Sequence, residues 1–283
     1  AGCARDAGME HSSGTLVVID ATVIPYLDFG ALMAAHRGSG AMVTAAVRSD
    51  RVGSTGDHLT PVGIYVFSRE VLAEVSATGY QDIKEVLIPR LHMANKRVGT
   101  YCTEEACWRV SDAASYLAVN EWVMHQEMDR TDWPGFARMG DGRVHERASV
   151  ASGVRLVGPV LIGPDTRIGE DVTVVGPTLI GGGCVVAERA VICRSVVWDG
   201  CRIGSASAID GCILTNMASV ASGSRVYGAV VQWSSRRRVG WRWRRGVEGG
   251  AHDVQVTAIG GVGGSASGRD DRRRFRRRVD ERV

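Results

Sequence analysis

The sequence lacks the features that would place the protein in a membrane or direct it to secretion. No run of 18 or more apolar residues occurs in its 283 residues, which argues against a transmembrane helix. Its first residues have no basic stretch followed by an apolar one, so we expect no secretory signal. An initiator methionine is also missing. We therefore expect a cytoplasmic protein with no membrane partner, and a sequence that is a fragment of a longer one.

Cysteines with paired spacing are also missing. The number of cysteines, seven, is odd, and no CxxC pair occurs. The odd number argues against a disulfide framework and the missing CxxC pair against a zinc site, so reduced thiols in a cytoplasm are the favoured interpretation. Aromatic residues supply only 6% of the sequence, which predicts an aliphatic core. The cysteines are Cys3, Cys102, Cys107, Cys184, Cys193, Cys201 and Cys212.

Charge is unevenly distributed along the chain. The net charge is +3, but the segment 233–283 holds 14 Arg against 6 acidic residues, so this end carries +8 and the rest −5. We predict that the basic tail, residues 232–283, is disordered and without a defined function. Two alternatives stay open. Its arginine clusters with interleaved tryptophans could bind RNA or single-stranded DNA, or the segment is translated out of frame. Elsewhere we expect no nucleic-acid partner.

A six-residue repeat of apolar residues is the strongest pattern present. It runs without a miss to Trp198, and two five-residue strides then shift its phase. Neither a helix nor a strand has that period. Hexapeptide repeats are typical of a parallel β-helix, whose three-sided coils each stack apolar side chains on the coil below. The repeated positions are Val144, Val150, Leu156, Ile162, Ile168, Val174, Ile180, Val186, Ile192, Trp198, Ile203, Ile209, Leu214, Val220 and Val226.

Residues 144–231 therefore predict a β-helix of about five coils. A β-sandwich of short strands is the alternative, but ten consecutive positions in phase favour the coil. General base catalysis near neutral pH commonly uses a histidine. None occurs between Glu146 and Ala251, and His145 stands at the first coil. We interpret the coil as a scaffold or assembly surface.

Residues 15–125 alternate between strand and helix signals, which predicts an α/β domain. Asp28, Ser68 and Asp82 each precede a predicted helix as a cap, and Asp82 and Glu85 have capping-box spacing. His36 ends the first helix, where a positive charge is favourable. Strands are predicted at 15–20, 41–47 and 63–67, and helices at 29–36, 69–75, 83–91 and 111–124.

Four segments in this order carry a resemblance to a known family: LVVIDATVIPYLDFGALMAAH, GIYVF, GYQDIKEVLIPRL and WRVSDAASYLAVNEWVM. With the hexad repeat behind them, residues 15–231 resemble the sugar-phosphate nucleotidylyltransferases, or NDP-sugar pyrophosphorylases. The mannose-1-phosphate guanylyltransferase-like branch has a C-terminal left-handed β-helix. The resemblance implies a partial Rossmann-like nucleotidyltransferase domain at 15–125. A leader (1–14) stays unassigned, and a linker (126–143) precedes the β-helix (144–231).

The resemblance implies that a nucleoside triphosphate and a sugar 1-phosphate react to give an NDP-sugar and pyrophosphate, with Mg²⁺ as cofactor. It also implies a homo-oligomer formed through the β-helix. Four departures from the family pattern imply impaired transfer. The Gly-rich triphosphate loop would precede residue 15, and the Glu-Lys-Pro segment does not fit between Val47 and Gly63. Thr22 stands at the family's metal-binding aspartate, with Asp20 as a weak substitute, and Trp108-Arg109-Val110 replaces Trp-x-Asp.

Catalytic residues are therefore left unassigned. For substrate binding the resemblance implies Gly63, Tyr65, Asp82, Lys84, Glu85 and Trp108. A helix cap with its solvated first turn is the alternative for the three charged residues, and a core position is the alternative for the tryptophan. Two further functions stay open: a non-catalytic sugar-nucleotide sensor or assembly subunit, and a hexapeptide acyltransferase. The sequence names neither the sugar nor the base.

Overall fold

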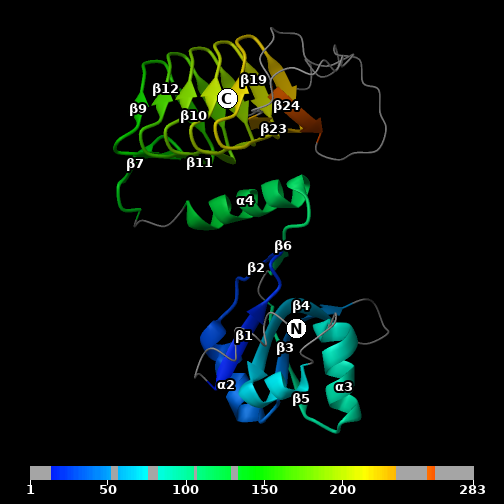
Figure 1. Ribbon diagram of the computed structural model, residues 1–283. Helices are drawn as coiled ribbons and strands as arrows, with labels where there is room; N and C mark the ends of the chain where they lie inside the picture. Colours follow the sequence, from blue (N-terminus) through cyan, green and yellow to red (C-terminus); the bar gives the residue numbers. More distant parts are fainter. Residues whose placement is uncertain are drawn as a thin grey trace. The chain divides into compact units, whose positions relative to one another are not determined.

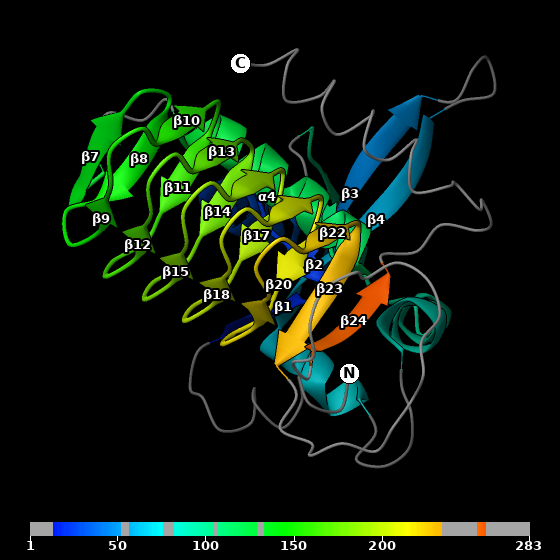
Figure 2. The ribbon, with the colours of Figure 1, turned by 90° about the horizontal axis from the view of Figure 1, so that it is seen from above.

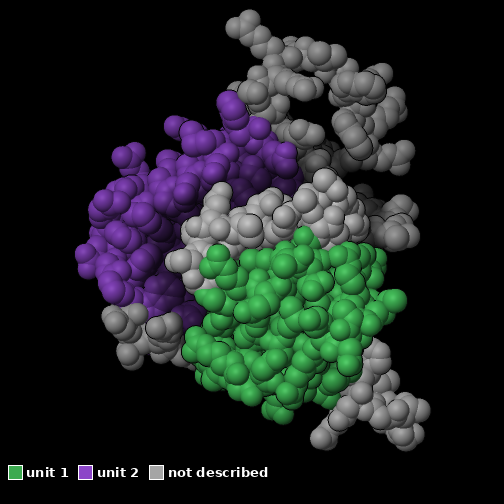
Figure 3. Space-filling view, turned by 60° about the horizontal axis from the view of Figure 1, so that its bottom comes forward, with its two compact units in different colours: residues 1–110 green, residues 111–283 purple. Residues whose placement is uncertain are grey.

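The computed structural model describes residues 14–51, 57–75, 82–104, 107–128, 133–233 and the strand at 254–258. The chain divides into two compact units, Ala1–Val110 and Ser111–Val283 (Figure 3). The predicted leader lies outside the described residues except for Gly14. Most of the predicted basic tail also lies outside them. The division falls earlier in the chain than the domain boundary expected at 125.

The first unit is built on a four-stranded sheet with the order β1-β4-β3-β5 (Figure 1). Its strands are β1 (Thr15–Ile19), β3 (Val43–Arg51), β4 (Asp57–Ser68) and β5 (Val98–Cys102). β3 and β5 are parallel, whereas β4 is antiparallel to both β1 and β3. A separate pair joins β2 (Val23–Ile24) to β6 (Trp108–Arg109). The predicted α/β class is confirmed.

Alternation along β4 gives this sheet two apolar faces. Ile64 and Val66 pack with Leu32 of α2 (Phe29–Ser39) on one face. Tyr65 and Phe67 belong to the opposite cluster with Leu87 and Leu91. Apolar side chains of three short helices pack into this second cluster: η2 (Arg69–Glu74), η3 (Ile83–Leu87) and α3 (Ile88–Met93). The sheet therefore has a core on each side.

Helix ends in this unit follow local capping chemistry. The Asp28 carboxylate accepts a hydrogen bond from Ala31 N at 3.0 Å, and α2 ends at Gly40, whose φ is +63°. The predicted Ser68 cap is wrong, because its hydroxyl donates to Ala41 O instead and η2 is a short 3₁₀ helix. The helix after Asp82 changes from π to α at Ile88, directly before Pro89. Pro89 lies in the first turn of α3, where its fixed φ suits the helix.

The second unit contains the predicted coil. Three parallel sheets run along it, and the longest contains six successive coil strands, which makes five full turns (Figure 2). Handedness aside, the β-helix is confirmed and begins at Gly142. The strands are β8 (Gly142–His145), β9 (Ser149–Val150), β10 (Arg155–Val157), β11 (Val160–Ile162), β12 (Arg167–Ile168), β13 (Thr173–Val175), β14 (Thr178–Ile180), β15 (Val185–Val186), β16 (Val191–Cys193), β17 (Val196–Val197), β18 (Arg202–Ile203), β19 (Ala208–Asp210), β20 (Ile213–Leu214), β21 (Ser219–Val220), β22 (Arg225–Tyr227) and β23 (Ala229–Trp233).

The repeat positions fill the interior of the coil with one exception. Ile162 and Ile180 are paired across 18 residues, but Ile180 is paired with Val197, only 17 residues on. Val197 is fully buried, whereas the Trp198 side chain is 38% exposed. The placement of Trp198 in the apolar column is therefore wrong. The phase shift comes one stride earlier, because a shorter corner follows Ile192.

That corner explains the change of coil length. Two residues, Gly176 and Pro177, separate β13 from Thr178, whereas Arg194 alone separates Cys193 from Ser195. Arg194 has φ +42°, a conformation that favours glycine. At the same place in the next two coils the chain has Gly211 and Gly228, both with positive φ. One left-handed residue thus replaces two at each of the shorter corners.

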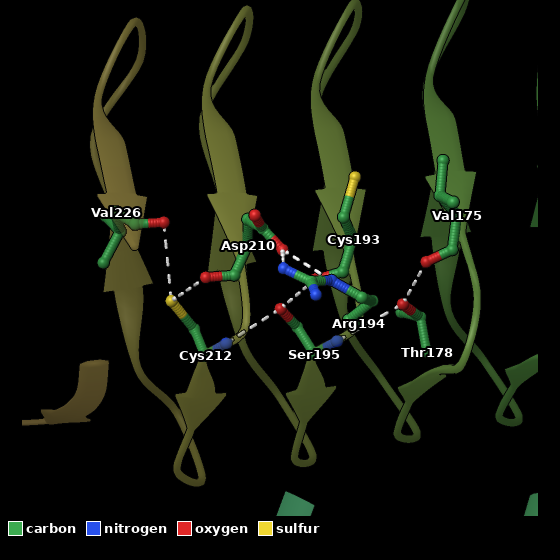
Figure 4. A network of polar contacts seen from close by, with 8 residues as sticks. All are labelled: Val175, Thr178, Cys193, Arg194, Ser195, Asp210, Cys212 and Val226. Carbon is green, nitrogen blue, oxygen red and sulfur yellow. Dashed lines mark hydrogen bonds and ion pairs between the residues drawn. The ribbon is translucent and has the colours of Figure 1, made fainter. Parts of the chain in front are cut away.

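Polar side chains continue the coil-to-coil bonding at this corner (Figure 4). Thr178 Oγ1 accepts from Ser195 N at 3.3 Å, and Ser195 Oγ accepts from Cys212 N at 3.0 Å. All three side chains are buried. Arg194 donates to Asp210 Oδ1 through Nε at 3.1 Å and Nη2 at 2.7 Å. The corner is therefore a hydrogen-bonded ladder, which satisfies backbone groups that no strand pairs.

Two antiparallel strands lie at the ends of the longest sheet. β7 (Phe136–Met139) pairs with β8, inside the predicted linker, and β24 (Val254–Ala258) pairs with β23. The strand β24 corrects the prediction that the whole tail is disordered. An edge strand such as β23 presents unpaired backbone groups that attract another strand, whatever the periodicity of that segment.

α4 (Ala113–Glu127) belongs to the same unit as the coil (Figure 1). The Asp112 carboxylate and Ser115 hydroxyl form a reciprocal capping box at its start. Trp198 Nε1 donates to Tyr116 Oη at 3.1 Å, with the two rings edge to face. The Trp198 side chain, which points out of the coil, thus contacts α4 through Tyr116. None of the helices in the described parts of the chain is long and apolar enough to cross a membrane.

Candidate functional site

A charged cluster forms where β1 ends. The backbone N–H of Asp20 donates to Gly63 O at 2.8 Å, which continues the β1–β4 pairing by one residue. The Asp20 carboxylate then accepts from Thr22 N at 3.0 Å and from Thr22 Oγ1 at 2.8 Å. These are the bonds of an Asx-type turn, so local sequence alone brings Thr22 beside Asp20.

Arg109 joins this cluster from a distant part of the chain. The antiparallel pair β2–β6 places Arg109 opposite Val23. From there its Nη1 donates to Asp20 Oδ2 and to Thr22 Oγ1, both at 2.7 Å. This hydrogen bond to Arg109, with those from Thr22, lowers the pKa of Asp20 to about 2. Asp20 is therefore a carboxylate at any physiological pH.

Gly63 is the neighbour that makes room for the guanidinium. Its φ of +87° is one that residues with a side chain rarely adopt. A Cβ here would lie 3.0 Å from Arg109 Nη2, 3.0 Å from Val23 Cγ2 and 3.2 Å from Asp20 Cβ. Gly63, predicted for substrate binding, thus first allows close approach of the Arg109 side chain.

Tyr65 lies two residues further along β4 and is only 3% exposed. Burial, then the negative charges of Asp82 and Asp20, raise the pKa of its hydroxyl to about 12. No hydrogen-bond partner for this hydroxyl occurs among the residues that the structure describes. A substrate could reach the Tyr65 ring only if its neighbours moved.

The other predicted pocket residues have identifiable local roles. Asp82 accepts from Lys84 N at 2.7 Å and from Glu85 N at 2.9 Å, which is the helix-cap alternative. Lys84 and Glu85 are exposed in the first turn after it. Trp108 is half-buried on β6, opposite Ile24. The sequence named Arg109 only as a departure from Trp-x-Asp, and the pairing with Asp20 was missed.

The residues at this cluster do not fit Mg²⁺. A hard divalent cation prefers several negatively charged or carbonyl oxygens. Here Asp20 Oδ2 lies 2.7 Å from the Arg109 guanidinium, and Thr22 carries no charge. Val110 stands where the resemblance implies a second carboxylate. No group of three or more His, Cys, Asp or Glu side chains is placed to hold a metal within the described residues. Asp20 and Thr22 therefore bind the Arg109 side chain in place of a metal ion.

A cavity of about 420 Å³ lies at the other end of β1, beside Thr15 and Ser68. Its buried polar residue is His36, whose Nδ1 lies 2.8 Å from Thr44 Oγ1 and whose Nε2 lies 3.1 Å from Ser68 Oγ. Ser68 Oγ also donates to Ala41 O at 3.1 Å. Burial lowers the pKa of His36, so the expected charge at the α2 end is wrong.

One comparison with known families gives a match, in the coil. Residues 140–236, about a third of the chain, match the family model described as the GMPPB C-terminal domain. This is the hexapeptide-repeat β-helix of mannose-1-phosphate guanylyltransferase beta. A search of curated proteins found no match.

The match and the five-turn coil agree in position, since the coil begins at Gly142 and β23 ends at Trp233. They support the resemblance of the chain to nucleotidylyltransferases with a C-terminal left-handed β-helix. Residues 140–236 are therefore similar to the GMPPB C-terminal domain, the β-helix of a sugar-nucleotide guanylyltransferase.

Proposed function

We propose that this chain acts in NDP-sugar metabolism as a sugar-nucleotide-binding relative of the guanylyltransferases, with impaired nucleotidyl transfer. Two observations support the binding of sugar nucleotides. An α/β unit with a polar cluster at the end of β1 precedes a coil of the GMPPB C-terminal family. We assign the coil to assembly of a homo-oligomer by its resemblance to the family. Its interior is filled with aliphatic side chains and leaves no room for a ligand there.

The Asp20–Arg109 ion pair is the single observation that argues for impaired transfer. In transfer to a sugar phosphate, a divalent cation held by carboxylates offsets the charge that develops on the phosphates. In this chain the carboxylate of Asp20 is bonded to Arg109 and Thr22. An arginine can bind a phosphate oxygen, but it carries one positive charge where a divalent cation carries two, and it cannot coordinate several oxygens as a metal ion does. Binding is therefore retained more readily than catalysis.

Two measurements on the same preparation test this proposal. The first is calorimetric titration with GDP-mannose in the presence of Mg²⁺, for which we expect a measurable Kd. The second is pyrophosphate release from GTP and mannose 1-phosphate, for which we expect little or none. Steady turnover would show that the chain is an active guanylyltransferase. No binding of GDP-mannose, UDP-glucose or dTDP-glucose would remove the sugar-nucleotide function altogether.

A further inference from the structure

The guanidinium of Arg109 has one edge engaged and one edge open. Its Nη1 is held by Asp20 and Thr22 at 2.7 Å each. Its Nη2 packs against Gly63, where an added Cβ would lie 3.0 Å from it, and no acceptor for Nε or Nη2 occurs among the described residues. The Arg109 side chain is 44% exposed. A planar guanidinium held on one side and open on the other suits two parallel bonds to a phosphate group.

The charge of the cluster matches that of a metal site. A divalent cation with two carboxylates has zero net charge, and so has one arginine with one carboxylate. Asp20 is the remaining carboxylate here, and Val110 stands where the resemblance places the second. An approaching phosphate therefore meets the same formal charge in both arrangements. What differs is that Arg109 is part of the chain and stays in place without added metal.

Asp20 keeps the guanidinium in position rather than binding the ligand. Its Oδ2 bonds Arg109, and its Oδ1 bonds the amide and hydroxyl of Thr22. Thr22 in turn accepts from the same Nη1 atom. The three residues form a closed set of short bonds, so the open edge of Arg109 has a fixed direction. A preorganised donor loses little conformational entropy when its ligand binds.

From this geometry we propose that the Asp20–Thr22–Arg109 cluster binds a phosphate group of a sugar phosphate or sugar nucleotide without a divalent cation. The inference deepens the proposed function and rests on it. Arg109 supplies the contact to the phosphate oxygens, and Gly63 makes room for the guanidinium that supplies it. Ligand binding by this chain is therefore independent of Mg²⁺.

Calorimetry on the full chain tests the metal independence first, with no variant. GDP-mannose, mannose 1-phosphate and inorganic phosphate are titrated separately, each in excess EDTA and in millimolar Mg²⁺. We expect the Kd in EDTA to agree within about twofold with that in Mg²⁺ for at least one ligand; a tenfold change would correspond to about 1.4 kcal/mol. The three ligands separate a requirement for the nucleotide, the sugar or the phosphate alone. Binding that requires Mg²⁺ overturns the inference and leaves the proposed function standing.

Variants then test the role of Arg109. Arg109→Gln should weaken binding in EDTA about 10- to 100-fold, the effect of losing a charge-assisted bidentate contact. Arg109→Lys should weaken it less, because it keeps the charge but not the fork. Arg97→Gln is the matched control, since Arg97 is an exposed arginine of the same unit, and it should leave the Kd unchanged.

Melting temperatures show whether each variant is folded. Binding in EDTA that a folded Arg109→Gln variant retains in full overturns the role of Arg109, and with it the inference. No binding of these ligands in either EDTA or Mg²⁺ overturns this inference, and it overturns the proposed function as well if UDP-glucose and dTDP-glucose also fail to bind. Failure of the Gln variant to fold leaves the Lys variant and the metal arms to decide.

Discussion

Arg109 Nη1 lies 2.7 Å from Asp20 Oδ2, joining two residues that are 89 positions apart in the chain. Both side chains are more than one third exposed, at 44% and 37%. Surface ion pairs of this kind stabilise a fold by at most roughly 1 kcal/mol. The importance of this pair lies in what it does to the site: it places a fixed cation where a carboxylate pair would hold a metal.

The ion pair should depend on pH only in strong acid. The pKa of Asp20 falls from an ordinary 3.8 to about 2 in the folded chain. A lowered pKa means that the stabilisation is fully present above about pH 4 and is lost as the pH falls through about 2. The carbon resonance of the Asp20 carboxyl, followed by NMR, should therefore titrate near pH 2. A midpoint near 4 would show that the pair does not form in solution.

Gly63→Ala should destabilise the first unit. The positive φ and the contacts with Arg109 and Val23 at 3.0 Å together cost about 1–3 kcal/mol in free energy of unfolding. Gly38→Ala is the matched control, because Gly38 lies in α2 with nothing within 4 Å of its added carbon. The control should stabilise by about 0.5–1 kcal/mol. Urea unfolding measures both, and equal effects would contradict the crowded position of Gly63.

From the register of the coil we predict that removing the smaller side chain of Val197 destabilises the fold more than removing the larger side chain of Trp198. Val197→Ala removes two methyl groups from a fully buried side chain and should cost about 2 kcal/mol. Trp198→Ala removes a larger side chain that is 38% exposed, together with its bond to Tyr116. We expect this second change to cost less, about 1 kcal/mol. A reversed order in thermal unfolding would return Trp198 to the apolar column.

The Arg194–Asp210 pair should show measurable coupling. Asp210 is almost fully buried, at 8% side-chain exposure, and accepts two hydrogen bonds from Arg194. A double-mutant cycle of Arg194→Gly and Asp210→Asn should give a coupling energy of about 1 kcal/mol. Glycine also relieves the left-handed backbone, which offsets part of the loss in the single variant. The single variant alone is therefore a poor measure of the pair.

The matched control cycle uses Arg147 and Asp165. These two side chains are 64% and 62% exposed and lie 2.9 Å apart. Their coupling should be near zero because water screens an exposed pair. Equal coupling in the two cycles, measured by urea unfolding, would show that burial of Asp210 contributes nothing.

Much of the coil could be predicted because its order is local and periodic. Each hexad points its repeat residue inward, so the aliphatic residues at 144, 150, 162 and onwards specify a β-helix without long-range information. The register of the coil beyond Ile192 was harder to predict from the sequence. Val197 and Trp198 are both apolar, and only the left-handed turn at Arg194 decides which of them enters the core. A one-residue shift reverses the face of a strand.

Two helix caps of the first unit were likewise determined by the local sequence, since Asp28 and Asp82 bond amides two or three residues away. The chemistry of the site was decided only by tertiary structure. Pairing of β2 with β6 brings Arg109 to Asp20, and β4 brings Gly63 beside both. No local pattern encodes such a meeting, because it depends on which strands pair across the fold. The sequence therefore determined a β-helix behind an α/β unit, and the fold decided that an arginine holds the carboxylate.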